Sequence, residues 1–342
     1  MKNRILLSLL TAGILLSGCS KSEHEEGPGT VPGDGQSVAI RLSSGIGTPS
    51  KAGTKAPVTA DAPATVQIEG WESNSGTPDY TKATSDWQST AEVKVLTQEE
   101  IADDETANDI TLSPVQYYNA DENIKTYIRG WYPAAKSANG TVTFSTAEDA
   151  DKGYDFAGDG TDDVLLSNEV SGDKNAEVSQ ALVFDHVTAQ LIFKVVKGEG
   201  LAAGTKIKTI KVKNTAVPSS ITLGNVTDGA DATVVNYTDK NELEVPNITV
   251  AEIGQKAEPA GDPLMVKPVD NNTMVTLYIE TVKADGTTTA ATYDNVALTT
   301  SDGKLTKGSA YTVTLTFKQA GISLEGSITP WNDKATGEGE VI

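Results

Sequence analysis

Tyr311-Thr312-Val313-Thr314-Leu315-Thr316-Phe317 is the stretch that decides the fold class of this chain. Large apolar residues occupy every second position, and threonines occupy the positions between them. Because successive side chains of a strand point to opposite faces, this order predicts a half-buried antiparallel strand with one apolar and one polar face. Valine and threonine favour the same extended conformation.

Similar short strands recur through the chain. Asn139-Gly140 is a favoured two-residue hairpin turn. Only residues 97–107 carry a helix-start signal, and this segment is too polar for a core helix. Many short strands separated by Gly, Asn and Pro predict an all-β fold of β-sandwich domains. The other predicted strands are residues 38–42, 66–68, 93–95, 110–112, 127–133, 141–144, 182–196, 207–213 and 274–282.

The chain is long enough for more than one such domain. It has 342 residues, 38% of them hydrophobic, which is a globular composition. At the usual ~150 residues per domain, about two domains are expected. We predict an N-terminal β-sandwich domain over residues 38–178 and a C-terminal one over residues 179–342, with the boundary before the apolar run that starts at Leu182.

The first 18 residues are typical of an export signal. Lys2 and Arg4 precede an apolar run that is too short to span a bilayer. The run ends in Leu16-Ser17-Gly18-Cys19, which resembles the bacterial lipobox, where the cysteine is acylated and the bond before it is cut. We predict a signal peptide over residues 1–18 and lipid (palmitate) on Cys19. The alternative is an ordinary signal peptide with an incidental cysteine.

Two loose stretches surround the first predicted strand. Residues 19–37 are polar and rich in Gly and Pro, so they predict a flexible tether. A second such stretch runs over residues 45–63 and contains Lys51 and Lys55. A trypsin-like protease that cut at Arg41, Lys51 or Lys55 would release the strand predicted at residues 38–42.

The composition excludes several classes of function. A formal net charge of −20 disfavours nucleic-acid binding, because an anionic surface repels phosphate. Acylation of the only cysteine excludes thiol catalysis, disulfides and a cysteine zinc site. His186 lies in or beside a strand, which favours a structural role over that of a catalytic base. We predict a non-enzymatic protein without a cofactor.

Two patterns leave alternatives open. Four aspartates between Asp155 and Asp163 suit an ordinary acidic turn, which is favoured, or a weak calcium site near Asp159. Trp71, Tyr80 and Trp87 suit buried packing anchors, also favoured, or a sugar-stacking platform. The platform would make the protein an outer-membrane surface lipoprotein that binds glycan.

Four segments together resemble the fimbrillin family of Bacteroidetes lipoproteins, which includes subunits of lipoprotein-derived (type V) pili and Mfa-like proteins. The most specific features are Phe-x-His at residues 184–186 and Ile-x-Pro-Trp at residues 328–331. The four segments are the lipobox at Cys19, Tyr127–Pro133, Leu182–Leu191, and Tyr311–Phe317 followed by Ile322–Trp331.

This resemblance implies two tandem transthyretin-like β-sandwich domains and a structural pilus subunit that supports cell adhesion. It places the protein at the outer membrane through the lipid on Cys19, or in a pilus at the cell surface. It implies assembly with other pilus subunits, as a homo- or heteropolymer, by strand exchange and β-augmentation. Residues 38–42 are then the candidate removable strand, and residues 321–342 the candidate donor strand.

Overall fold

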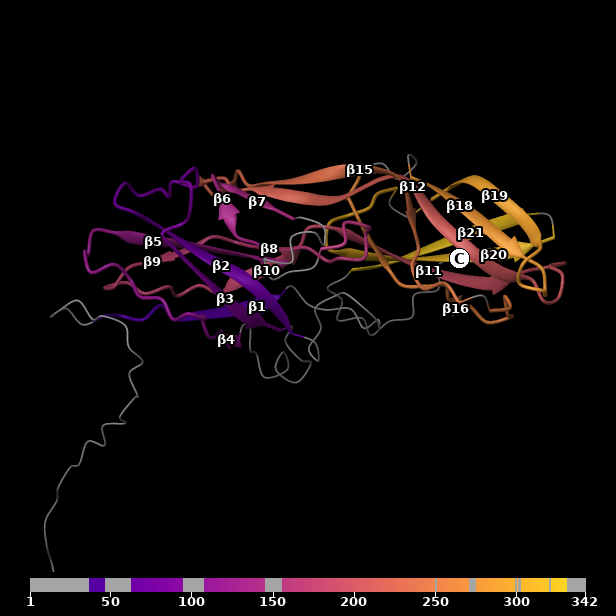
Figure 1. Cartoon of the computed structure of the whole chain (residues 1–342), viewed down its shortest axis with the longest axis horizontal. Helices are drawn as coiled ribbons and strands as arrows, with labels where there is room; N and C mark the ends of the chain where they lie inside the picture. Colours follow the sequence, from indigo (N-terminus) through magenta and orange to yellow (C-terminus); the bar gives the residue numbers. More distant parts are fainter. Residues whose placement is uncertain are drawn as a thin grey trace, which may run out of the picture. The chain divides into compact units, whose positions relative to one another are not determined.

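The computed structural model describes residues 37–46, 63–94, 108–144, 156–249, 251–270, 275–298, 300, 303–319 and 321–330. These ranges contain β-strands and no helix (Figure 1), which confirms the predicted all-β fold. All described residues lie in one compact unit, within residues 37–342. The described part of the chain has no helix that could span a membrane.

The first sheet has the strand order β3-β2-β5-β8-β10-β1-β4, and β9 also pairs with β5. Beyond β4, Ser113 exchanges backbone hydrogen bonds of 2.8 and 2.9 Å with Thr90 of β3, so the two ends of the sheet are joined. The strands are β1 (Leu42–Ile46), β2 (Ala64–Ser73), β3 (Trp87–Val93), β4 (Asn108–Ile110), β5 (Lys125–Tyr132), β8 (Leu165–Ser167), β9 (Val170–Gly172) and β10 (Leu182–His186). Alternate apolar side chains of these strands, among them Val66, Ile128 and Phe184, form one buried cluster, the first core.

Two further sheets enclose a second core. One has the order β16-β11-β20-β21, with β17 also on β11, and the other has the order β19-β18-β12-β7-β6, with β15 also on β12. Phe193, Ile210, Ile279 and Leu315 come from both sheets and meet in this core. The strands are β6 (Ser137–Ala138), β7 (Thr141–Thr143), β11 (Ala189–Lys197), β12 (Lys206–Thr222), β15 (Val234–Glu244), β16 (Glu258–Pro259), β17 (Leu264–Val266), β18 (Thr276–Val282), β19 (Thr289–Ala297), β20 (Ser309–Lys318) and β21 (Gly321–Pro330), and a separate hairpin joins β13 (Val226–Thr227) to β14 (Ala230–Asp231).

The stretch from Tyr311 to Phe317 is the centre of β20, as its alternation predicts. Its four large apolar side chains are buried, and the three threonines between them are half-buried. The predicted antiparallel pairing holds on one side only. β20 pairs antiparallel with β21 but parallel with β11, over residues 310–317. The periodicity of the strand determines its apolar face and leaves the direction of its neighbours open.

The apolar run of residues 182–196 is two strands rather than the one predicted. β10 pairs with β8 and β1 in the first sheet, whereas β11 pairs with β20 and β17 in another sheet. The chain changes sheet at Val187 and Thr188, where the Val187 amide donates to the carbonyl of Val164. Val187, Thr188 and Ala189 are buried in succession, so the alternation of buried and exposed positions stops at the break.

The long strand β12 runs from the second core to a third buried cluster, which contains Ile221 and Val142. Its N-terminal part pairs with β18, and its last residues pair with β7, with Ile221 opposite Val142. β15 runs antiparallel to it over most of its length (Figure 1). Between β6 and β7, Asn139 and Gly140 both have positive φ, 50° and 73°, which confirms the predicted two-residue turn.

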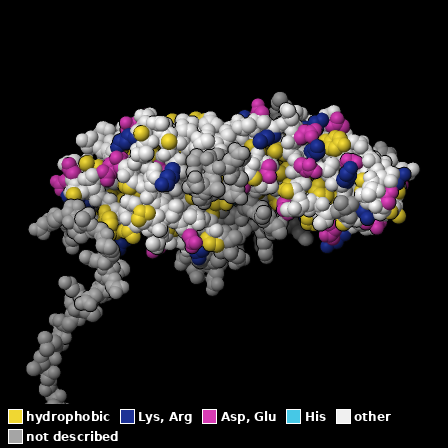
Figure 2. Space-filling model, in the orientation of Figure 1, with side chains coloured by type: hydrophobic (Ala, Val, Ile, Leu, Met, Phe, Trp, Pro, Cys, Tyr) yellow, Lys and Arg dark blue, Asp and Glu magenta, His cyan; other side chains and the backbone are white. Residues whose placement is uncertain are grey.

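The lysines of β12 lie on its outer face. Lys208, Lys211 and Lys213 form ion pairs of 3.0, 2.9 and 2.9 Å with Glu280, Glu242 and Asp294. Figure 2 shows basic and acidic side chains interspersed over the visible face of the molecule. These exposed pairs keep the face soluble and add little stability, about 0–1 kcal/mol each.

Candidate functional site

β1 lies between β10 and β4 in the first sheet. It pairs parallel with β10, with Ser44 opposite Leu182, and antiparallel with β4, with Leu42 opposite Ile110. The regular strand thus begins at Leu42 and not at Val38, as the sequence predicted. The reason is that Val38 and Ile40 form backbone hydrogen bonds of 3.0 and 2.8 Å with residues of the irregular segment 116–118. Only from Leu42 onward does the chain pair with β4.

The segment alternates between buried and accessible side chains. Ile40 and Leu42 are buried in the first core, and Ser44 is fully buried, whereas Arg41 is exposed. Burial of each aliphatic side chain contributes about 1.5–3 kcal/mol. Because β1 has only three paired residues on each side, its removal breaks few backbone hydrogen bonds but opens an apolar groove in the core.

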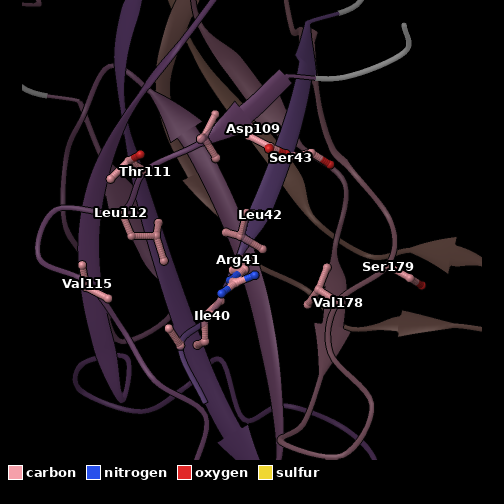
Figure 3. A pocket seen from close by; sticks show the side chains of 12 residues that line it. Ile40, Arg41, Leu42, Ser43, Asp109, Thr111, Leu112, Val115, Val178 and Ser179 are labelled. Atoms are coloured by element: carbon pink, nitrogen blue, oxygen red, sulfur yellow. The ribbon is translucent and has the colours of Figure 1, made fainter. Parts of the chain in front are cut away.

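A cavity of about 410 Å³ lies alongside residues 39–43. Its lining comes from residues 39–43 on one side and residues 109–112, Val115 and Val178 on the other. Figure 3 shows Ser43 and Asp109 near each other at one end of the cavity, with Leu112 and Ile40 further along. Arg41 and Val115 in this lining are exposed, so the cavity is open to solvent beside the segment.

The predicted processing residues are only partly described. Cys19, Lys51 and Lys55 lie outside the described residues, while Arg41 is exposed immediately before β1. A cut after Arg41 would separate Ile40 from Leu42 and leave all of β1 on the remaining chain. Cuts at Lys51 or Lys55 would instead free the whole segment 38–46.

The candidate donor begins as a strand at the edge of its sheet. Residues 321–330 form β21, which pairs with β20 over its full length. Ile322 and Leu324 pack against the second core. No described strand pairs with the other edge of β21. The rest of the candidate donor, residues 331–342, lies outside the described residues.

Sequence reasoning missed a similarity between these two strands. Residues 40–46 read Ile-Arg-Leu-Ser-Ser-Gly-Ile, and residues 322–328 read Ile-Ser-Leu-Glu-Gly-Ser-Ile. Both place isoleucine, leucine, a small residue and isoleucine at alternate positions. A comparison of the two segments alone would have found this signal. The structure shows that Ile40, Leu42 and Ser44, three of the matching positions, are buried.

The predicted aromatic platform does not exist. Trp71 is 1% exposed and Tyr80 is 3% exposed, and their rings meet edge to face with centroids 4.8 Å apart. The ring centroid of Trp131 lies 6.5 Å from that of Trp71, in the same buried cluster. Trp87 is half-buried against Gly70 of β2. The sugar-stacking interpretation is therefore wrong, and burial of these aromatic side chains explains their spacing.

A buried arginine, Arg129 of β5, was not predicted as important. Its side chain is fully buried, and its guanidinium donates to both carboxylate oxygens of Asp231, at 2.9 and 3.0 Å. It also donates to the Tyr80 hydroxyl at 3.0 Å and to the Gly224 carbonyl at 3.2 Å. The Tyr80 hydroxyl donates in turn to Glu169. The only sequence signal was the scarcity of arginine, with Arg4 and Arg41 as the others.

Opposing effects act on the pKa values of this cluster. Burial alone would lower the pKa of Arg129, but hydrogen bonds to Asp231 and Tyr80 raise it above its usual value. Burial alone would raise the pKa of Asp231, but hydrogen bonds from Arg129 and Thr233 lower it. Both groups are therefore held in their charged forms, and Arg129 ties the hairpin of β13 and β14 to β5.

The carboxylates of the acidic loop form hydrogen bonds and an ion pair with other groups of the protein. Asp159 accepts hydrogen bonds of 3.0 and 2.6 Å from the amide and hydroxyl of Thr161. Asp162 accepts from the amides of Ala157 and Gly158. Asp163 pairs with Nδ1 of His186 at 2.8 Å, and both side chains are buried. No cluster suited to a metal ion occurs among the described residues, and His186 has the structural position predicted for it.

The family relationship follows from a comparison with known proteins. The sequence model of the fimbrillin-like family matches residues 54–331. The chain belongs to the fimbrillin-like family. The resemblance drawn from the sequence is thereby confirmed. The matched residues of this fimbrillin-like chain start after β1 and include β21.

Solved structures with low sequence identity resemble this fimbrillin-like chain. A protein from Bacteroides uniformis, described as a candidate cell adhesion protein, is 17% identical with a TM-score of 0.50, covering 86% of this chain and 98% of that one. A fimbrial protein from Bacteroides vulgatus is 14% identical, with a TM-score of 0.44 and coverage of 85% and 99%. The tip fimbrial protein Mfa3 from Porphyromonas gingivalis, with a C-terminal truncation, is 9% identical, with a TM-score of 0.40 and coverage of 86% and 100%. At such identities the first comparison supports a shared fold alone. No curated protein matches this chain in sequence.

Proposed function

We propose that this fimbrillin-like protein is a structural pilus subunit that supports cell adhesion and assembles by strand exchange at the position of β1. The main observation behind the proposal is that β1 lies between β10 and β4 through short pairings on both sides, and that the segment around it supplies Ile40 and Leu42 to the first core. A strand with these properties can be replaced by another strand of the same pattern.

The proposed cycle begins with the lipid on Cys19, which holds the exported chain at the outer membrane. Cleavage at Lys51 or Lys55 then removes the segment 38–46 together with the lipid. The groove left behind exposes apolar side chains and unpaired backbone groups, which is unfavourable in water. A strand from a neighbouring subunit fills the groove and extends the polymer.

We also propose that the chain has two transthyretin-like domains, residues 38–178 and 179–342, and no enzymatic activity. The first and second cores support this division, although β10 contributes to the first of them and a third buried cluster joins residues of both ranges, among them Trp131 and Ile221. The proposed partners are other pilus subunits and, before cleavage, the membrane. Nucleic acid is not expected as a partner, given the net charge of −20.

The test compares protein from cells with purified precursor treated with a trypsin-like protease. We expect a free N-terminus at Ala52 or Ala56 and oligomers after trimming. The triple variant Arg41→Ala/Lys51→Ala/Lys55→Ala should remain uncut before residue 63 and stay monomeric, and Lys256→Ala, in an exposed position, should behave as wild type. A trimmed protein that stays monomeric, with lipidated full-length chain persisting on cells, would contradict the polymerising role.

A further inference from the structure

We propose that the cavity beside residues 39–43 binds an apolar dipeptide with free termini. Arg41 binds the carboxylate of this ligand, Asp109 binds its ammonium group, and aliphatic side chains of the lining contact its apolar side chains. The inference is independent of the proposed strand exchange, because it concerns the uncut chain with this segment in place.

The cavity lies where the strand pairing beside this segment is interrupted. Residues 40–42 bond at both ends to another part of the chain, with Gln116 at one end and Ile110 at the other. Residues 111–115 lie between these two partners and have only Arg41 opposite them. Such additional residues disrupt a ladder locally, and residues from both sides of the interruption line the cavity.

Two side chains of opposite charge line this cavity without a partner. Arg41 and Asp109 are both exposed, and within the described part of the chain neither has a hydrogen bond or an ion pair. Figure 3 shows the Arg41 guanidinium in the middle of the lining and Asp109 at one end, near Ser43. A guanidinium matches the geometry of a carboxylate, and a carboxylate accepts hydrogen bonds from an ammonium group. A ligand with both groups therefore satisfies both side chains.

The spacing of the two charges fits the ends of a dipeptide. Asp109 lies opposite Ser43, which is two residues along the segment from Arg41. At about 3.3 Å per residue, these positions are roughly 7 Å apart along the strand. An extended dipeptide spans at most about 7 Å. A single amino acid is too short to reach both side chains, and the ends of an extended tripeptide are too far apart.

The rest of the lining favours apolar side chains in the ligand. Leu42 and Leu112 are each 4% exposed, Val178 is half-buried and Val115 is 51% exposed. A ligand that covers Val115 removes apolar surface from water, which is favourable. The volume of about 410 Å³ is within the usual range of small-molecule sites.

The charge of the protein disfavours simple anions as ligands. The chain has a formal net charge of −20, and Asp109 adds a negative charge to the same cavity as Arg41. A phosphate or a dicarboxylate is repelled by both. A dipeptide with free termini has no net charge, so it can bind Arg41 without this repulsion.

The experiment measures binding to the full, uncut chain by isothermal titration calorimetry at pH 7. The probe is leucyl-leucine. Its N-acetyl derivative lacks the ammonium group, its C-terminal amide lacks the carboxylate, and leucine and trileucine differ from it in length. We expect leucyl-leucine to bind and each of the other four to bind about tenfold or more weakly, because each loses one charged contact.

Two variants assign the two ends of the ligand. Arg41→Gln should bind leucyl-leucine about tenfold more weakly and no better than the amide, whereas Asp109→Asn should bind it no better than the N-acetyl derivative. Both residues are exposed, so both variants should keep the Tm of wild type. The controls Lys256→Gln and Asp239→Asn are exposed and outside the cavity, and they should bind as wild type does.

The outcomes that overturn the inference are distinct. The first is no binding of leucyl-leucine at millimolar concentration. The second is equal binding of its N-acetyl derivative, which would show that the site takes a carboxylate without an ammonium group. The third is binding that persists in both Arg41→Gln and Asp109→Asn, since it would lie outside the cavity. None of these results bears on strand exchange, because no segment is cut or released in the experiment.

Discussion

The guanidinium of Arg129 holds the carboxylate of Asp231 by two hydrogen bonds of 2.9 and 3.0 Å, although the two residues are 102 positions apart. Arg129 belongs to β5 of the first sheet, and Asp231 belongs to β14, which follows the long strand β12. The Tyr80 hydroxyl and the Glu169 carboxylate, the latter 3.5 Å away, complete the surroundings of the buried cation. This contact joins the hairpin of β13 and β14 to the first sheet.

Removal of the cation should destabilise this junction. Arg129→Met leaves two carboxylates without their partner, and we expect a loss of about 3 kcal/mol in the free energy of unfolding. Amide exchange should accelerate over residues 224–233. The matched control is Lys213→Met, which breaks an exposed pair with Asp294 and should cost less than about 1 kcal/mol. Equal losses in the two variants would show that the Arg129 cluster has no special role.

Glu69 should make stability depend on pH. Its side chain is buried, and burial raises its pKa above the usual value, although hydrogen bonds from Ser137 act in the opposite direction. A carboxyl group with a raised pKa in the folded state adds stability below its unfolded pKa, near 4.5, and this stability is lost as the pH rises through the folded pKa.

The variant Glu69→Gln tests this dependence. Glutamine keeps an acceptor for the Ser137 amide and does not ionise, so the unfolding free energy of wild type should fall relative to that of the variant as the pH rises above about 4. Denaturant titrations across this range measure the difference. The exposed control Glu258→Gln should show no such divergence. Parallel curves for wild type and Glu69→Gln would refute the prediction.

Gly70 is required by the position of Trp87. A Cβ atom on Gly70 would lie 2.1–2.4 Å from indole atoms of Trp87, far inside contact distance. We expect Gly70→Ala to displace the indole, lower stability by about 1–3 kcal/mol and change the tryptophan fluorescence. Gly254→Ala is the control, because nothing lies within 4 Å of its added methyl group. Unchanged fluorescence in Gly70→Ala would count against the close packing.

The acidic loop should not respond to calcium. Asp159, Asp162 and Asp163 already accept hydrogen bonds or pair with His186, so calcium would have to displace these partners. We expect millimolar calcium to leave Tm unchanged, whereas Asp163→Asn, which removes the charge from a buried pair, should lower the unfolding free energy by about 3 kcal/mol. A calcium-dependent rise in Tm that Asp159→Asn abolishes would support the metal-site interpretation instead.

Local patterns predicted much of the fold. The alternation of residues 311–317 identified β20 and its buried face, and Asn139-Gly140 identified a turn whose positive φ values are present in the structure. The same reasoning joined β10 and β11 into one strand, because residues 182–196 contain no Gly, Pro or Asn to mark a break. It also left open whether the aromatic side chains of Trp71 and Tyr80 are buried or exposed, which depends on what packs over them.

The sequence by itself determined that this chain is all-β, and its segments resembled the fimbrillin family that the comparison confirmed. It also contained the matching patterns of residues 40–46 and 322–328. Only the tertiary structure decided that β1 lies between β10 and β4, that Ser44 is buried and that Arg129 meets Asp231. The physical reason is that side-chain periodicity assigns an apolar face to each strand locally, whereas strand partners and buried charge pairs join residues far apart in the chain, through contacts that exist only after folding.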